Sequence, residues 1–130
     1  MRRESRDWLS QAEADLETAN DCFTSRHFYA AAFFCQQAVE KGLKALYIER
    51  KRIAPPRTHN LAQISEELDA PSDVLSVARS LTPEFVISRY PDAAGGPPYE
   101  LYDEQNTKPI LEGAAEVMSW IRAEIEKLQG

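Results

Sequence analysis

The chain has 130 residues, a length that suits one domain, and we expect a single domain over residues 1–130. With 43% apolar residues, 28% charged residues and a formal net charge of −6, the composition is that of a globular protein and excludes general disorder. No run of about 18 apolar residues occurs, and the charged opening leads into no apolar signal-peptide core. We therefore expect a cytoplasmic protein with no membrane span.

Two long helices are predicted in the first half of the chain. A helix over residues 4–23 is indicated by apolar residues three or four positions apart: Trp8, Ala12, Leu16, Ala19 and Phe23. A second helix, over residues 26–51, is apolar on nearly every side in its first half, so we expect it to lie at the centre of the fold. The pair Pro55-Pro56 blocks its continuation, since proline offers no amide proton.

The middle of the chain predicts shorter helices. Asn60 is a candidate N-cap with Gln63 three residues later, and Leu61, Ile64 and Leu68 follow at helical spacing. Further start signals stand at Pro71-Ser72 and Thr82-Pro83-Glu84. The run Phe85-Val86-Ile87 also fits a short strand, but a lone strand would leave its backbone groups unpaired, so we predict a helix.

The last third of the chain predicts a loop and a final helix. Residues 91–102, with Gly95-Gly96 between prolines, indicate a loop. The final helix carries apolar residues from Ile110 to Leu128, and we expect Thr107 to cap it, because a cap at Asp103 would put Pro109 inside the helix. The expected fold is thus all-α, an up-and-down antiparallel bundle of about five helices.

Metal and redox chemistry are not expected. Cys22 and Cys35 lie 13 residues apart in helical stretches, without Cys-x-x-Cys spacing or a cluster of histidines, so we expect two small apolar side chains and no metal or cofactor. The acidic chain as a whole should repel phosphates. Residues 41–57, however, hold six basic side chains and one acidic one, so an anionic partner would be attracted there.

Five short motifs carry a resemblance to a known family. Residues 36–45 read Gln-Gln-Ala-Val-Glu-Lys-Gly-Leu-Lys-Ala, and Thr58-His59-Asn60-Leu61 follows the proline pair. The spacing Trp8, Ala12, Asp15, Leu16, the Tyr29 and Ala32 pair, and Ser88-Arg89-Tyr90-Pro91 fit the same pattern. In this order the motifs resemble the HEPN domain family (higher eukaryotes and prokaryotes nucleotide-binding), and they extend over nearly the whole chain.

The resemblance implies a helical bundle, usually dimeric, related to the helical domain that accompanies certain nucleotidyltransferases. Some family members are ribonucleases whose site is an Arg followed four to six residues later by His. Others lack that pair and serve as binding or partner domains. Arg89 has no His downstream of it. Arginine holds phosphate but does not move protons near neutral pH, so the resemblance implies the non-ribonuclease branch and no catalytic residue.

The preferred hypothesis is a non-catalytic, homodimeric module that binds a nucleotide or RNA phosphate, a small nucleotidyltransferase in a toxin–antitoxin-like pair, or both. The resemblance and the charge pattern favour these ligand-binding residues: Gln37, Lys41, Lys44, His59, Arg89 and Tyr90. Lys41 and Lys44 share a helical face, and with Arg89 beside them they would cradle a phosphate. The alternative role of the two lysines is to complement the helix end as solvated charges.

Two other functions remain open at this point. One is a metal-independent ribonuclease that uses Arg89 or Arg52 with His59. The other is a purely structural dimerisation domain whose apolar surface lies on the second and final helices. For the remaining candidates we expect structural roles: His27 as a solvent-facing residue, His59 as a hydrogen-bonding loop residue or cap, and Tyr99 and Tyr102 as packing residues, or rings that stack on a base.

Overall fold

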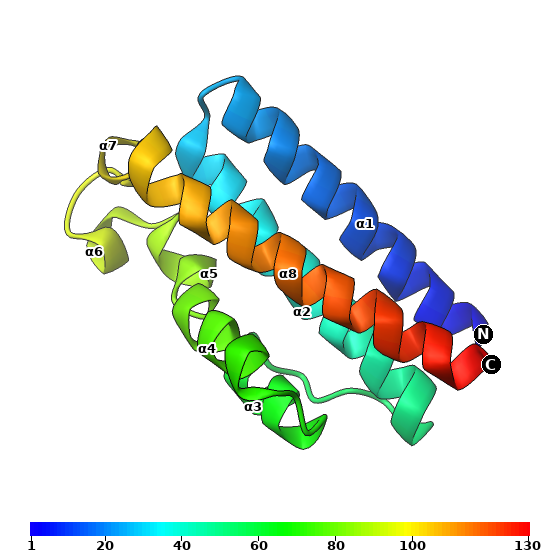
Figure 1. The fold of residues 1–130 in the computed structure, drawn as a ribbon. Coiled ribbons are helices and arrows are strands. Elements are labelled where there is room, and N and C mark those ends of the chain that lie inside the picture. Colours follow the sequence, from blue (N-terminus) through cyan, green and yellow to red (C-terminus); the bar gives the residue numbers. More distant parts are fainter.

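Helix α2 (Phe28–Lys51) forms the centre of the molecule, which a computed structural model describes over residues 1–130 (Figure 1). Its 24 residues span about 36 Å at 1.5 Å per residue, the full height of the bundle. Val39, Leu43 and Leu46 have no solvent exposure. The prediction of a central second helix is confirmed.

Two other long helices flank α2. Helix α1 (Arg3–Thr24) runs antiparallel to α2, and α8 (Glu104–Gln129) lies beside both, so that the chain ends meet at one end of the bundle (Figure 1). Glu49 of α2 joins them, because its carboxylate accepts hydrogen bonds from the Arg2 backbone N–H at 3.1 Å and the Gln129 side chain at 3.1 Å. A Cβ atom at Gly42 would lie 2.8 Å from the Met118 sulfur of α8, so a glycine is what lets α2 and α8 approach closely.

The remaining chain forms two short helices and three single helical turns. The short helices are α3 (Leu61–Glu67) and α4 (Ser72–Leu81), and the turns are α5 (Glu84–Ile87), α6 (Pro91–Ala94) and α7 (Pro98–Leu101). Asn60 caps α3 as predicted, since its side chain accepts from the Gln63 amide at 3.1 Å. The helical prediction for Phe85-Val86-Ile87 is confirmed by α5, and the all-helical bundle is the predicted fold class.

The structure differs from the expected start of two helices and from one expected loop. Helix α2 begins at Phe28 and not at residue 26, because Arg26 takes a left-handed backbone conformation with φ 64° that closes the turn from α1. The expected loop at 91–102 contains the turns α6 and α7. Asp103, and not Thr107, caps α8: its side chain accepts from the Asn106 amide at 2.7 Å, while Asn106 accepts from the Asp103 amide at 2.9 Å. This reciprocal capping offsets the backbone hydrogen bond that Pro109 removes inside the helix.

The two cysteines are free thiols in different environments. Cys35 is buried in the core, and burial is the main cause that raises its pKa to about 12, with Glu84 and Cys22 adding to the effect. Cys22 is only half-buried. No helix of the chain has the length and apolar character needed to cross a membrane.

Candidate nucleotide-binding site

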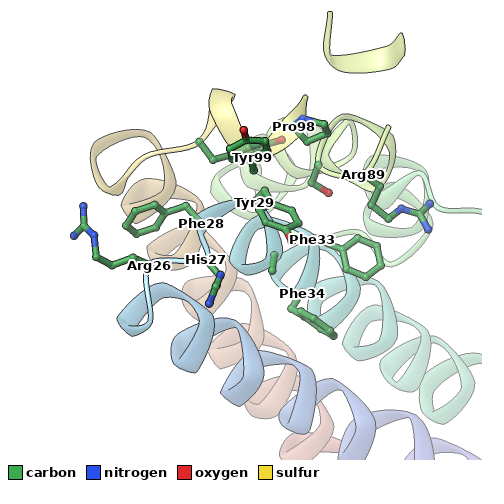
Figure 2. Close-up of a pocket in the computed structure, with 12 residues that line it drawn as sticks. Arg26, His27, Phe28, Tyr29, Phe33, Phe34, Arg89, Pro98 and Tyr99 are labelled. Atoms are coloured by element: carbon green, nitrogen blue, oxygen red, sulfur yellow. The ribbon is translucent and has the colours of Figure 1, made fainter. Parts of the chain in front are cut away.

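A cavity of about 650 Å³ opens at the end of the bundle where α1 turns into α2 (Figure 2). The N-terminal turns of α2 supply one wall, which consists mainly of aromatic rings. The full lining is Arg26, His27, Phe28, Tyr29, Ala30, Phe33, Phe34, Ser88, Arg89, Pro98, Tyr99 and Tyr102. Aromatic faces next to arginine guanidinium groups suit an anionic ligand with a planar body.

The opposite wall comes from α7 and the residue after it. In Figure 2, Pro98 and Tyr99 lie across the cavity from Tyr29. Tyr99 is 64% exposed, whereas Tyr102 is anchored, because its hydroxyl donates a hydrogen bond to the Glu84 carboxylate. Burial raises the pKa of Tyr102, and the hydrogen bond and charge of Glu84 raise it further. Burial also raises the pKa of Glu84, and the Tyr102 hydrogen bond offsets only part of that effect.

Arg89 stands at the edge of this cavity against three aromatic rings. Its guanidinium carbon lies 4.3 Å from the ring centroid of Phe85, 4.9 Å from that of Phe33 and 4.9 Å from that of Tyr90. Its Nε donates to the Phe85 carbonyl at 2.8 Å, but no carboxylate forms an ion pair with it. The rings fix the guanidinium and leave its outer N–H groups available for an anion.

His59 packs on the same phenyl ring as Arg89. The imidazole is stacked on Phe85 with ring centroids 3.7 Å apart and planes inclined by 13°. Two groups this close to one ring cannot share a face, so Arg89 and His59 hold Phe85 between them. The fold therefore brings Arg89 and His59 to the same ring, although 29 intervening residues separate them in the sequence.

Glu40 fixes the orientation of His59. The buried Glu40 carboxylate lies 2.9 Å from His59 Nδ1, and it accepts hydrogen bonds from Gln36 at 3.1 Å and from Lys44 at 3.1 Å. This contact assigns the proton of a neutral imidazole to Nδ1 and leaves the Nε2 lone pair free. The His59 side chain is 55% exposed. The predicted cap role belongs to Asn60, and His59 instead bonds a helix side chain.

The two lysines predicted to hold phosphate are held in ion pairs on α2. Lys44 and Glu40 are 9% and 7% exposed, and the Lys44 ammonium also lies 5.6 Å from the Trp8 ring. Lys41 pairs with Asp15 of α1 at 2.6 Å. Phe33, which Arg89 contacts, precedes Lys41 by eight residues, about 12 Å along the helix axis. The structure thus places Arg89 apart from the two lysines.

Of the other predicted binding residues, one lies beside Arg89 at the cavity and one lies among the paired side chains around Glu40. Tyr90 is half-exposed beside Arg89 at the cavity end. Gln37 donates to its neighbour Gln36 at 2.7 Å and belongs to the Glu40 network. Arg52 follows the last turn of α2, twelve residues beyond Glu40, about 18 Å along the axis from the residue that holds His59. Arg52 and His59 therefore do not converge.

Sequence reasoning missed most of the cavity wall. The first half of α2 was expected to be central and apolar on nearly every side, and Phe28 is indeed buried, but Phe28, Tyr29, Phe33 and Phe34 also line the cavity and Tyr29 is exposed. The sequence pattern did not indicate Arg26 as a cavity residue, and His27 is exposed as expected. The signal available in the sequence was the density of rings, four within seven residues of a helix that already had an apolar face to bury.

Comparison with known proteins assigns a family to this arrangement. The profile of the HEPN domain matches residues 5–125 of the chain. The crystal structure of TT1696 from Thermus thermophilus is similar with a TM-score of 0.86 and 27% identity, over 95% of this chain and 99% of that one. The structure of ST0689, an archaeal HEPN homologue, is similar with a TM-score of 0.82 and 30% identity over the same shares. No curated protein sequence matches the chain.

Proposed function

The chain belongs to the HEPN domain family, and we propose that it is a nucleotide-binding module that holds its ligand in the aromatic cavity with the phosphate on Arg89. The single observation that carries this proposal is an unpaired guanidinium fixed by aromatic rings at the edge of a cavity of about 650 Å³. Nucleotide bases stack on aromatic faces, and arginine binds phosphate through two parallel N–H groups.

The charge distribution supports this place over the basic segment 41–57. Within that segment Lys51, Arg52 and Arg57 form no ion pair, but none of them lines the cavity. Lys41 and Lys44 are paired, and Arg50 is held by Glu124 at 2.8 Å and by the Leu68 carbonyl at 2.6 Å. An incoming phosphate would have to displace those partners. At Arg89 it would displace no ion-pair partner.

Calorimetric titration with adenosine 5′-monophosphate tests the proposal. Arg89→Ala should weaken binding by about tenfold or more, the usual loss for a charged hydrogen-bond partner. Arg79→Ala is the matched control, because Arg79 is an exposed arginine on α4 whose contact with Glu66 is long, at 3.7 Å. Equal affinity for the two variants would contradict the proposal.

We also propose that the chain forms a homodimer and pairs with a nucleotidyltransferase. Apolar side chains are exposed around the cavity at Tyr29, Val86, Tyr90, Tyr99 and Leu101, and this apolar surface supports association there. Light scattering of the purified chain measures whether it is a dimer. A complex whose second component is identified by mass as a nucleotidyltransferase would support the toxin–antitoxin-like pairing, whereas a monomer that co-purifies with no such protein would contradict it.

A metal-independent ribonuclease is the second candidate, favoured by the pairing of His59 and Arg89 on one ring. His59 Nε2 would take the proton from a ribose 2′-hydroxyl, whose oxygen bonds to the adjacent phosphorus while the P–O5′ bond breaks and the leaving 5′-oxygen takes a proton from solvent. Arg89 would neutralise the phosphate under attack. Glu40 would stabilise the imidazolium that forms. Cleavage of single-stranded RNA that His59→Ala abolishes and Arg79→Ala retains would establish this activity, and Arg79 serves as the control because it is exposed on α4, outside the cavity. RNA left intact by the wild-type protein would eliminate it.

A further inference from the structure

Residues 91–101, which we call the strap, form the outer wall of the cavity. The strap consists of the single turns α6 and α7 with Gly95-Gly96 between them, and it lies outside the three long helices at one end of the bundle (Figure 1). Pro98 and Tyr99 line the cavity, whereas residues 91–97 do not. No residue of the strap is buried. The cavity therefore has a long helix, α2, on one side and a short exposed segment on the other.

The backbone of the strap is hydrogen-bonded to itself and not to the long helices. The Gly95 amide donates to the Pro91 carbonyl at 2.9 Å, and the Glu100 amide donates to the Pro97 carbonyl at 3.0 Å. A Cβ atom added at either glycine of the strap would meet no atom within 4 Å, so the middle of the strap has room to move. Segments with few buried contacts open locally at a low free-energy cost, while the rest of the fold stays intact.

Two hydrogen bonds from side chains hold the end of the strap that leads into α8. The Leu101 carbonyl accepts from the Asn106 side chain at 2.8 Å. The next residue, Tyr102, donates its hydroxyl proton to the Glu84 carboxylate at the start of α5. Tyr102 is half-buried, whereas Tyr99 is 64% exposed. The Tyr102–Glu84 bond therefore joins the two ends of the chain segment that contains the strap.

From this arrangement we propose that the strap is a lid, which turns about Gly95-Gly96 to admit a ligand and closes over it, while the Tyr102–Glu84 hydrogen bond holds its end. The inference rests on the proposed nucleotide binding and adds how the ligand enters and is retained. Glycine supplies the backbone freedom that the movement needs, and Gly95 has a φ of 76°. Closure covers the exposed ring of Tyr99, and burial of apolar ring area favours the closed state.

Hydrogen–deuterium exchange of the protein without ligand tests the role of Tyr102. Tyr102→Phe keeps the ring and removes the hydroxyl, so amides of residues 98–102 should exchange about tenfold faster, the usual effect of one lost hydrogen bond to a charged acceptor. Exchange in α2 should not change. Tyr99→Phe is the matched control, because it removes an exposed hydroxyl of the same wall. Equal exchange rates in the two variants would overturn the assigned role of Tyr102.

Exchange of the wild-type protein with saturating adenosine 5′-monophosphate tests closure. A closing lid should slow exchange about tenfold over the whole strap, including residues 91–97, which do not line the cavity. Slowing confined to residues 98–102 would show direct contact without movement and would overturn the lid. Calorimetric binding that leaves exchange of the strap unchanged would overturn the lid and leave the proposed nucleotide binding standing. No binding at all would overturn both.

Light scattering of the same samples separates closure from association with a second copy. Slower exchange of the strap at an unchanged molecular mass supports the lid. Slower exchange with a doubled mass would assign the protection to a subunit contact and overturn the lid. In the comparison of Tyr102→Phe with Tyr99→Phe, a second copy packed at this end would act on both variants alike.

Discussion

The two halves of α2 differ in whether the charged side chains on them and beside them have ion-pair partners. In the half towards the chain termini every buried or half-buried charge has a partner, as the pairs Lys41 with Asp15, Lys44 with Glu40, and Arg50 with Glu124 show. In the half next to the α1–α2 turn, Arg89 has no ion pair, Arg26 has an exposed one, and aromatic rings reach solvent. A basic residue near a helix motif therefore indicates a ligand only where the fold leaves that residue unpaired.

The largest expected effect is at the paired half. Glu40→Ala should lower the free energy of unfolding by about 3–4 kcal/mol, because it leaves the Lys44 ammonium buried without a partner. Urea denaturation measures the loss. The matched control is Glu66→Ala, which breaks an exposed contact and should change stability by less than about 0.5 kcal/mol. A loss below about 1 kcal/mol in Glu40→Ala would mean that the pair does not hold this half together.

A smaller loss is expected where α2 meets α8. Gly42→Ala places a Cβ atom 2.8 Å from the Met118 sulfur and 2.9 Å from Ile121 Cδ1, and overpacking of this kind costs about 1–3 kcal/mol. Gly96→Ala is the control, since nothing lies within 4 Å of its added Cβ atom, and it should be neutral. Thermal denaturation compares the two variants, and equal melting temperatures would contradict the close helix approach.

The acid side of the stability curve should depend on Glu49. Burial acts to raise the pKa of Glu49, but hydrogen bonds, that from the Arg2 amide first among them, and the charge of the N-terminus together outweigh it, and the net pKa is below the ordinary 4.5. Because the pKa of Glu49 is lower in the folded than in the unfolded state, its carboxylate stabilises the fold at pH values above the unfolded-state pKa. That stabilisation is lost as the pH falls through the folded-state pKa. Glu49→Gln should therefore reduce stability at neutral pH and flatten its decline below about pH 4.5. If Glu49→Gln lost stability below about pH 4.5 as steeply as the wild type does, this prediction would be contradicted.

Glu84, beside the cavity, should show the smallest effect and the opposite sign. Burial raises the pKa of Glu84, so the folded state binds a proton more readily than the unfolded state, and stability falls as the pH rises through the folded value. Glu84→Gln keeps an acceptor for the Tyr102 hydroxyl and should remove that fall. Denaturation from about pH 4.5 to 7 measures it. A variant less stable than the wild type at pH 7 would contradict this sign.

The sequence predicts the long helices well, because their apolar spacing and the Asn60 cap are local features. It misplaces the start of α8, because the bonds between Asp103 and Asn106 that offset Pro109 depend on a capping geometry no periodicity reveals. The candidate site is predicted less well. That Lys44 lies against Glu40 and Trp8, and that Arg89 and His59 share the ring of Phe85, are facts of tertiary packing.

The most direct test of the central claim is to map nucleotide binding along the chain by the amide chemical shifts of the labelled protein during titration with adenosine 5′-monophosphate. We expect saturable changes in amide chemical shift centred on residues 26–34 and 84–102, with residues 40–45 little changed. Shifts centred on Lys41 and Lys44, with residues 26–34 unmoved, would contradict it and return the site to the paired half of α2.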